Sequence, residues 1–598
     1  MKELVYPFDS KYILRNRKKL KKTLISDGSK RIVKKIAVLG GSTTSDIVSS
    51  LELFLLNVGI EPVFYQSEYN QYWEDAVFGN NELDSFSPDI IFIHTSYRNI
   101  TEFPDFVSDN EEMVNQKIQN QFQKLKTMWT SLTEKFACPI IQNNFEYPLC
   151  RHLGNSDCWN INGTTFFINS LNSLIGEYAR KNNGFYICDI NYLSSCIGLE
   201  KWHSSDAWCM YKYSMSVDVI PQFAYNLCNI IKSIYGKNKK VIALDLDNTL
   251  WGGIIGDDGQ DGIEIGQENP VAQSFSEFQS YIKKFKDFGV LLTVCSKNEE
   301  ENALLGLNHP ESVLKPDDFV SIKANWDSKD RNLINTADEL SLLTESFVFV
   351  DDNPAECEIV SSQVKDVSVI GFSDVSEAMY TISRSGYFEV TSISDDDLKR
   401  NQMYMANAQR LKQQKSFENY SDYLLSLEMT AEIDTFKTVY LKRITQLTNK
   451  SNQFNLTTKR YTVEEIEAVA VSGEHIAIYG KLEDKFGDNG VVSVVIGKIS
   501  GCELDIELWL MSCRVLKRDM ELAMLDSLVK FAQKHGISKI FGTYIPSGKN
   551  KMVMRFYPDT LGFSPVSENS DGVTRWSLDI RNYTKKNNVI KTKESECV

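Results

Sequence analysis

Apolar runs alternate with amphipathic stretches along the first 240 residues. Apolar residues predict a strand over Ile36–Leu39, and after a Gly-containing turn their helical spacing predicts an amphipathic helix from about Thr44 to Val58. Further apolar runs, each followed by polar residues, predict strands within 62–66, 88–96, 138–144 and 184–191. This alternation predicts a parallel, doubly wound sheet with its site at the carboxyl ends of the strands.

The same pattern resumes after the charged hinge SIYGKNKK. Apolar runs within 241–253, 290–298 and 346–356 again stop at polar residues. A polar helical stretch from about Asp395 to Leu427 then leads to a region of mixed strands and helices. Its strands are expected within 474–484, 489–500 and 502–513, and a long helix is expected to begin near Arg518.

These patterns predict an α/β fold throughout, in three domains. A chain of 598 residues agrees with this, because single cores stop growing beyond roughly 250–300 residues. The expected boundaries are 1–238 for a doubly wound domain with a basic N-terminal segment, 239–390 for a Rossmann-like domain, 391–428 for a helical connector and 429–598 for a mixed α/β domain.

Composition narrows the class of protein. Hydrophobic residues make up 42% and charged residues 24%, which argues against a disordered, collagen-like or disulfide-scaffold chain. We find no stretch of roughly 18 apolar residues and no secretory pattern at the start, so neither a membrane span nor a signal is expected. The twelve cysteines form no CxxC pair, so we expect reduced thiols and a cytoplasmic location, without a zinc site.

The charge is strongly acidic overall and unevenly distributed. A net charge of −15 argues against general nucleic-acid binding, because phosphates would be repelled. Basic residues nevertheless crowd the segment 11–35, opposed by little except Asp27. We interpret this segment as a solvated helix face or arm, and the alternative is a docking patch for an acidic partner.

Carboxylates follow two of the apolar runs in the second domain. Asp245 and Asp247 come directly after one strand, and Asp351 and Asp352 end another. Carboxylate oxygens are suitable ligands for Mg²⁺, and a carboxylate is also a competent nucleophile toward phosphorus. The second acid can protonate the leaving group and later activate water. The expected metal ligands are Asp245, Asp247, Asp351 and Asp352.

Other polar residues of this domain can handle phosphate. Lys329 can place positive charge against a transferring phosphoryl group. A hydroxyl and backbone N–H groups at the end of a strand can cradle phosphate. The residues expected to do so are Ser296, Lys297, Asn298 and Thr249.

In order along the chain, these residues resemble the motifs of the haloacid dehalogenase (HAD) superfamily. The matching motifs are Asp245-Leu246-Asp247-Asn248-Thr249, Ser296, Lys329 and Asp351-Asp352. The resemblance implies that Asp245 is the nucleophile, that Asp247 is the acid/base and that Mg²⁺ is the cofactor.

Longer stretches are similar to the FkbH-like branch of that superfamily. They include DLDNTLWGGIIGDDGQDGIEIG, FVFVDDNPAE, TNKSNQFNLTTKRY and SCRVLKRDMELAML, and they extend the resemblance from about Lys240 to Phe563, and less clearly into the first domain. This resemblance implies removal of phosphate from 1,3-bisphosphoglycerate and loading of the glyceryl unit onto an acyl carrier protein.

The third domain resembles the GNAT acetyltransferase fold through GKNKMVMRFYPDTLGF. The acetyl-CoA loop of that fold offers glycines to the pyrophosphate, but the corresponding stretch 514–519 has none, so a β-carbon obstructs close approach at each position. A carrier protein presents the same pantetheine thiol, so it remains an open alternative to acetyl-CoA as the partner of this domain. Cys513 has cationic sequence neighbours and precedes a helix, and both features activate a thiol. The alternative interpretation of Cys513 is a buried cysteine with a structural role.

The first domain resembles an SGNH hydrolase. The residues that carry this resemblance are Ser42 after Gly40-Gly41, Asn143 and His203. The Asp of the family's DxxH signature is missing from KWHSSD, so the imidazole lacks its usual orienting partner. We therefore expect a degenerate domain with a structural or docking role, with an active esterase as the alternative.

The leading hypothesis is a Mg²⁺-dependent enzyme that dephosphorylates a three-carbon acyl donor and passes the acyl group to an acyl carrier protein. The alternatives are a HAD phosphatase of a small sugar or glycerate phosphate, and a non-catalytic scaffold for carrier proteins. The sequence leaves open the acyl group, the carrier, the pathway, the phosphate that is removed and the oligomeric state.

Overall fold

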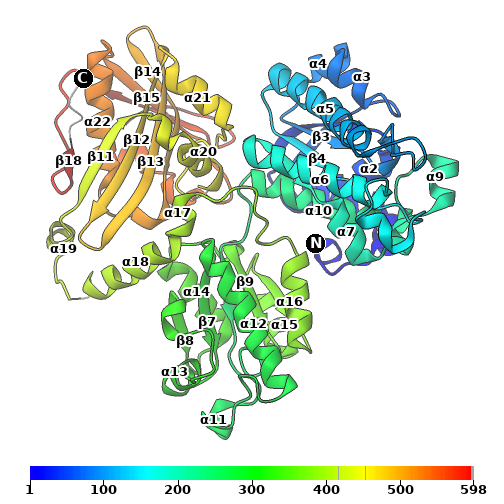
Figure 1. Cartoon of the computed structure of the whole chain (residues 1–598). Coiled ribbons are helices and arrows are strands. Elements are labelled where there is room, and N and C mark those ends of the chain that lie inside the picture. Colours follow the sequence, from blue (N-terminus) through cyan, green and yellow to red (C-terminus); the bar gives the residue numbers. More distant parts are fainter. Residues whose placement is uncertain (415, 452, 594–598) are drawn as a thin grey trace. The chain divides into compact units, whose positions relative to one another are not determined.

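The chain folds into two compact units. A computed structural model describes residues 1–414, 416–451 and 453–593, without the side chain of Lys412. One unit runs from Met1 to Ile234 and the other starts at Tyr235, close to the predicted boundary at residue 238. Three separate β-sheets with flanking helices confirm the predicted α/β class (Figure 1). The further boundaries at 390 and 428 stay predictions.

The first unit is built on a five-stranded parallel sheet of order β2-β1-β3-β4-β5. The strands are β1 (Ile32–Gly40), β2 (Ile60–Gln66), β3 (Ile90–His94), β4 (Ile140–Asn143) and β5 (Phe185–Cys188). Its longer helices are α1 (Ser10–Ser26), α2 (Ser45–Asn57), α5 (Glu111–Phe136), α6 (Thr164–Lys181) and α10 (Ile220–Ile234), and the shorter ones are α3 (Tyr72–Val77), α4 (Asn81–Phe86), α7 (Ile190–Ile197), α8 (Leu199–Trp202) and α9 (Ser205–Tyr211). Every residue of β3 is buried, as expected for a central parallel strand.

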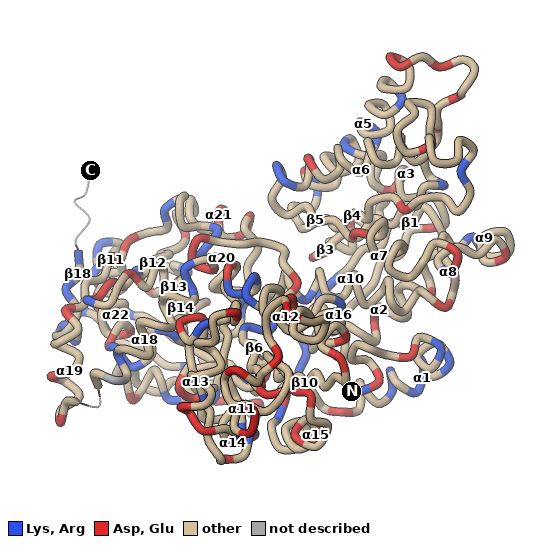
Figure 2. Tube along the Cα trace, turned by 60° about the horizontal axis from the view of Figure 1, so that its bottom comes forward, with Lys and Arg blue, Asp and Glu red and all other residues tan. Residues whose placement is uncertain are grey.

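Most of the basic segment belongs to helix α1, where lysines and arginines gather along the tube in Figure 2. Its apolar residues Ile13, Leu20 and Leu24 are buried. Two of its cations form ion pairs with acids of α2, Arg17 with Asp46 and Lys21 with Glu52. The helix is therefore an integral part of the first unit, with a solvated basic face.

The second unit contains another parallel sheet, of order β10-β9-β6-β7-β8. The strands are β6 (Val241–Leu244), β7 (Leu291–Ser296), β8 (Ser321–Ala324), β9 (Phe347–Asp351) and β10 (Ser368–Gly371). The helices are α11 (Ile255–Asp258), α12 (Pro270–Asp287), α13 (Glu300–Leu307), α14 (Lys329–Glu339), α15 (Pro354–Gln363) and α16 (Val375–Arg384). Ile242 and Leu244 join one apolar cluster whereas Val241 and Ala243 join another, because successive side chains of a strand point to opposite faces.

The third sheet has eight strands of mixed direction, in the order β16-β17-β15-β14-β13-β12-β11-β18. The strands are β11 (Thr430–Thr435), β12 (His475–Asp484), β13 (Gly487–Ser500), β14 (Glu503–Met511), β15 (Lys539–Tyr544), β16 (Ser564–Glu568), β17 (Thr574–Asp579) and β18 (Lys591–Lys593). Helix α22 (Met520–Lys534) packs on one face, and α20 (Leu441–Lys450) and α21 (Val463–Val471) pack on the other.

Three helices connect the two sheets of the second unit: α17 (Asp395–Leu398), α18 (Arg400–Gln414) and α19 (Tyr420–Ser426). They lie within 391–428, and a separate connector over these residues stays a prediction. Tyr404 of α18 is buried in the apolar cluster of the parallel sheet. Among the described residues, no helix has both the length and the apolar character needed to cross a bilayer.

Candidate active site

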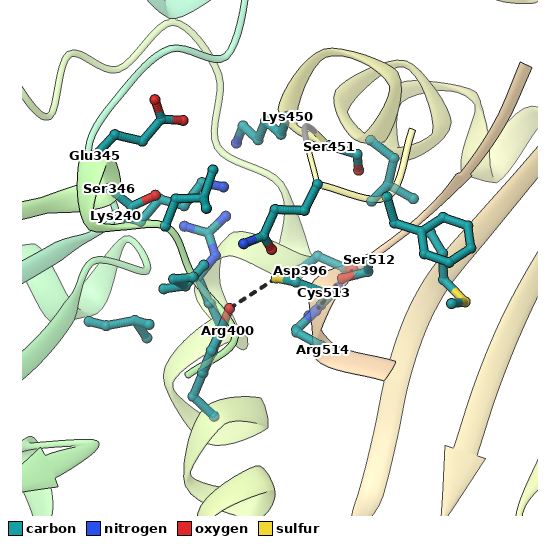
Figure 3. Close-up of a pocket in the computed structure, with 18 of the residues that line it drawn as sticks. Lys240, Glu345, Ser346, Asp396, Arg400, Lys450, Ser451, Ser512, Cys513 and Arg514 are labelled. Carbon is teal, nitrogen blue, oxygen red and sulfur yellow. Dashed lines mark hydrogen bonds and ion pairs between the residues drawn. The ribbon is translucent and has the colours of Figure 1, made fainter. Parts of the chain in front are cut away.

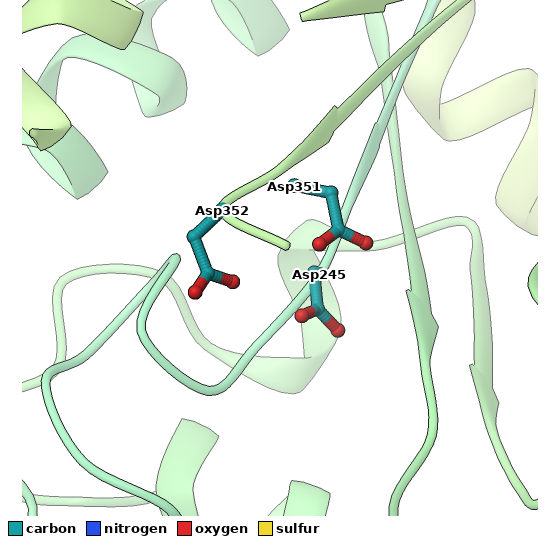
Figure 4. A group of neighbouring side chains, drawn as sticks. All are labelled: Asp245, Asp351 and Asp352. Atoms are coloured by element: carbon teal, nitrogen blue, oxygen red, sulfur yellow. The ribbon is translucent and has the colours of Figure 1, made fainter. Parts of the chain in front are cut away.

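The carboxyl edge of the second unit's parallel sheet gathers three carboxylates. Asp245 directly follows β6, and Asp351 is the last residue of the adjacent parallel strand β9. Each of Asp245, Asp351 and Asp352 offers a carboxylate oxygen, and these three oxygens lie within 4.8 Å of one another (Figure 4). The strand register therefore brings together residues that are about a hundred positions apart in the sequence.

Lys329 lies against this cluster from the first residue of helix α14. Its Nζ is 3.0 Å from Asp245 Oδ1 and 2.6 Å from Asp351 Oδ2. Burial alone would lower the pKa of Lys329, but the charges of Asp245 and Asp351 outweigh it and raise that pKa. The ammonium group therefore stays charged, as a group that neutralises a phosphoryl group must be.

The three carboxylates and one ammonium group leave the cluster with excess negative charge. Burial, followed by the charge of Asp245, raises the pKa of Asp351 to about 6 and raises the pKa of Asp352. A divalent cation would relieve this repulsion, and oxygen donors are those that Mg²⁺ prefers. The donor set of Asp245, Asp351 and Asp352 therefore fits Mg²⁺.

Asp247 was expected among the metal ligands, but the structure leaves its carboxylate outside this group of three. Its Oδ1 accepts hydrogen bonds from Trp251 Nε1 at 2.9 Å and from the backbone N–H of Ile255 at 3.1 Å. Its Oδ2 accepts one from Asn298 Nδ2 at 3.0 Å. Burial raises the pKa of Asp247, which favours a carboxyl that can hold a proton. This arrangement suits the predicted acid/base role.

The predicted phosphate-binding residues lie near the same carboxyl edge of the sheet, but they differ in their burial and in their partners. Ser296 is buried at the end of β7, and Thr249 Oγ1 lies 3.4 Å from Asp352 Oδ1. Asn298 orients Asp247, as described above. Lys297 forms an ion pair with Glu356 at 2.6 Å, so its charge is already compensated. Sequence reasoning missed Trp251, although its spacing of four from Asp247 was visible.

Cys513 lies at a second place in the same unit, on a 3-10 turn (Cys513–Val515) after β14. Its Sγ is 3.5 Å from the Tyr404 hydroxyl. The long helix predicted to begin near Arg518 is α22, which begins at Met520, after Cys513 in the sequence. Two cationic sequence neighbours already have acidic partners: Arg518 pairs with Asp484 at 3.1 Å and Arg514 with Asp396 at 3.4 Å.

Cys513 nevertheless lines a pocket together with several cationic residues (Figure 3). The lining also includes Lys240, which directly precedes β6, Leu291, which begins β7, and Ser346, which directly precedes β9. The pocket thus lies at the amino edge of the parallel sheet, whereas Asp245 lies at its carboxyl edge. Extended chain from Lys240 to Asp245 spans about 16 Å. The thiol and the carboxylate cluster are two separate sites.

In the first unit, the structure gives the three predicted residues different surroundings. Within the described part of the chain, the buried Ser42 Oγ has no hydrogen-bond partner. Asn143 Oδ1 accepts a hydrogen bond from the backbone N–H of Thr95 at 3.0 Å, and it also faces the buried ring of His94. His203 Nε2 donates to the Tyr147 carbonyl at 2.8 Å. No contact between serine and imidazole is therefore formed here.

Another amide lies beside the Ser42 turn. Asn99 Nδ2 donates to the Gly41 carbonyl at 2.9 Å, and a β-carbon on Gly41 would come within 2.5 Å of that nitrogen. Sequence reasoning missed Asn99, which follows β3 in the run SYRN. The degenerate SGNH-like domain stays a prediction, with an active esterase as its alternative.

Comparison with known proteins finds a family likeness in the first unit. Residues 35–232 match the family model described as FkbH, N-terminal domain. The resemblance to FkbH-like proteins is confirmed. The match lies in the first unit, where the sequence motifs had been least clear. No curated protein matches the chain.

A solved structure extends the likeness beyond that FkbH domain. The N-terminal part of the protein BF1531 from Bacteroides fragilis, containing a phosphatase domain complexed with Mg, is 27% identical. The match covers 63% of this chain and 99% of that chain, with a TM-score of 0.58. The predicted HAD-type phosphatase domain and its Mg²⁺ cofactor agree with this neighbour and with the donor set above.

Acetyltransferases are similar only at low TM-scores. The ribosomal-protein-S18-alanine N-acetyltransferase from Escherichia coli is 12% identical, with 27% of this chain and 99% of that chain covered and a TM-score of 0.21. An aminoglycoside 6'-acetyltransferase type Ii is 16% identical, with 25% and 99% covered and a TM-score of 0.20.

Proposed function

We propose that this chain is a Mg²⁺-dependent HAD-type phosphatase that also transfers a three-carbon acyl group, from a donor such as 1,3-bisphosphoglycerate, to an acyl carrier protein. The observation that carries the phosphatase half is the cluster of Asp245, Asp351 and Asp352 around Lys329. The likeness to a phosphatase-containing fragment with Mg supports it. The FkbH match and the Cys513 pocket support the transferase half.

Asp245 is the nucleophile of the phosphatase half. One of its oxygens attacks the phosphorus, a bond from Asp245 to phosphorus forms, and the bond from phosphorus to the substrate oxygen breaks. Lys329 holds positive charge beside the attacking carboxylate and the transferring group. Mg²⁺, when held by Asp245, Asp351 and Asp352, neutralises phosphate charge so that an anionic nucleophile can approach.

Asp247 moves the proton in both halves of this hydrolysis. Hydrogen bonds from Trp251 and Ile255 fix Oδ1, and Oδ2 keeps a lone pair besides the one used by Asn298. Protonated Asp247 gives its proton to the leaving oxygen. It then takes a proton from the water that attacks the aspartyl phosphate, which releases inorganic phosphate and restores Asp245.

Cys513 is the acceptor in the transferase half. Its sulfur attacks the carbonyl carbon of an acyl phosphate, the carbon–oxygen bond to phosphate breaks, and the thiol proton leaves with the phosphate. The resulting thioester passes by exchange to the pantetheine thiol of the carrier, which returns a proton to Cys513. An acyl phosphate is activated enough for this step, whereas hydrolysis alone would lose that activation.

One assay tests both halves. Purified protein is incubated with Mg²⁺, 1,3-bisphosphoglycerate and a candidate carrier, and phosphate release and the intact mass of the carrier are measured. Without carrier, where Cys513 can release no more than one equivalent of phosphate, Asp245→Asn should reduce multiple-turnover phosphate release by about 10³-fold or more, because an essential nucleophile is lost. The matched control is Asp338→Asn, an exposed carboxylate on α14. Release by Asp245→Asn at the parental rate would rule out the phosphatase assignment.

Cys513→Ala separates the two halves in the same assay. It should keep the phosphate release that needs no carrier, lose carrier loading, and lose the hydroxylamine-labile mass that the parent gains without carrier. Cys502→Ala, at an exposed cysteine in the turn between β13 and β14, should behave like the parent. Normal loading by Cys513→Ala would favour direct attack by the carrier's thiol. Phosphate release without any loading, even in the parent, would favour the plain phosphatase.

A further inference from the structure

The pocket beside Cys513 is lined by more cations than anions. Its two lining carboxylates are Asp396 and Glu345. Its five cationic lining residues are Lys240, Arg400, Arg443, Lys450 and Arg514. Figure 3 shows Lys240 and Lys450 extending from separate segments toward the space beside Cys513.

Neighbouring acids compensate only part of this positive charge. Asp396 serves two arginines, Arg443 at 2.9 Å and Arg514 at 3.4 Å. Asp397, just outside the lining, serves two more cations, Arg400 and Lys450. Glu345 is used by a further cation, Lys549, at 2.6 Å. Two carboxylates, Asp396 and Asp397, therefore compensate four cationic residues of the lining, so the pocket keeps a net positive charge.

Lys240 is the fifth cation. Within the described part of the chain, its ammonium group forms neither a hydrogen bond nor an ion pair. Burial lowers the pKa of Lys240. Cys513 lines the same pocket, and negative charge on its side chain would oppose this lowering. A half-buried ammonium group without a partner is costly unless an anion joins it. Lys240 therefore indicates that the pocket takes an anionic ligand.

The size of the pocket fits a small anion. Its cavity volume is about 80 Å³. One water needs roughly 10–15 Å³ on this measure, so several waters or one phosphate group can enter. Phosphate oxygens accept short, charge-assisted hydrogen bonds from lysine and arginine, which suits this lining.

We propose that this pocket is a phosphate-binding site that holds the phosphate of a small acyl phosphate beside the Cys513 thiol. This inference rests on the proposed function for the identity of the ligand. Because the Asp245 cluster lies at the other edge of the sheet, the donor has to be held a second time at the thiol. Lys240 binds the phosphate that leaves when the sulfur takes the acyl carbon, and the thiol proton departs with that phosphate.

Protection of Cys513 from alkylation tests the site. Full-length protein is treated with iodoacetamide, a neutral reagent, without Mg²⁺ and in EDTA, and the rate at Cys513 is followed by peptide mass spectrometry. Inorganic phosphate should slow this rate several-fold, whereas chloride at equal ionic strength should not. Lys240→Met should weaken the apparent affinity for phosphate roughly tenfold, which corresponds to about 1.4 kcal/mol.

Two further variants complete the design. Lys240→Arg keeps the charge and should keep the protection, and Lys399→Met removes an exposed lysine next to Arg400 and should match the parent. Equal protection in Lys240→Met, or a folded parent without protection by phosphate, would overturn the proposal. No turnover, metal or carrier is involved, so these outcomes are independent of phosphate release and carrier loading.

Discussion

At the scale of single residues, Glu146 in the first unit is a buried acid. It lies after β4, and neither carboxylate oxygen accepts a hydrogen bond of standard geometry in the described part of the chain. Burial raises its pKa from 4.5 to about 8, although the nearby backbone N–H groups of Glu146 and Tyr97 and the charge of Arg98 oppose the shift. At intermediate pH, such a carboxyl group is protonated in the folded protein and ionised in the unfolded chain.

The stability of the protein should therefore depend on the protonation of Glu146. Between about pH 4.5 and 8 the folded state holds a proton that the unfolded state has lost, so the free energy of unfolding falls as pH rises, by about 1.4 kcal/mol per unit. Glu146→Gln, which mimics the protonated form, should flatten this slope in urea unfolding at pH 5.5 and 8. Glu200→Gln, at an exposed acid, should keep it. An unchanged slope in Glu146→Gln would show that the carboxyl titrates normally.

At the scale of elements, Asp397 ties the connector helix α17 to α20. It accepts from the Ser394 hydroxyl at 2.8 Å as part of a capping box, and it pairs with Arg400 and with Lys450 at 3.2 Å. Burial opposes ionisation, but these two cations hold the pKa of Asp397 well below its usual value. The connector is thus positioned by one buried charge.

Asp397→Asn should lower the free energy of unfolding by about 3 kcal/mol, because removing one partner leaves buried cations uncompensated. Asp395→Asn, at an exposed acid in the same helix, should change it by no more than about 0.5 kcal/mol. Chemical denaturation of the full chain measures both. Equal stability of the two variants would mean that the connector is held mainly by its apolar contacts.

At the scale of the whole molecule, the division into two units has a functional consequence. All the residues of the carboxylate cluster and of the Cys513 pocket lie after Tyr235. A fragment that starts at Tyr235 should therefore release phosphate at a rate within a few-fold of the full chain, in the presence of Mg²⁺. The fragment 1–234 should release none. A folded but inactive second fragment would show that the FkbH N-terminal domain completes the phosphatase site.

Much of the fold was predictable because apolar periodicity is a local property. The helix predicted from Thr44 to Val58 is observed as Ser45–Asn57, and Asp245 and Asp351 lie at strand ends as predicted. Parallel strands then place both at one edge without further information. Cys513 was identified from its sequence neighbours, but its pocket obtains Lys240 and Arg400 from other segments.

The sequence by itself determined which residues end the strands, and therefore which carboxylates could meet. Only the tertiary structure decided how side chains are oriented and paired. Asp247 was predicted as a metal ligand, yet Trp251 and Asn298 hold it outside the cluster. Arg518 was predicted to act on Cys513, yet Asp484 holds it. The physical reason is that buried charges and hydrogen-bonding groups find partners wherever packing places them, and the contacts with Asn298 and Asp484 join residues 51 and 34 positions apart.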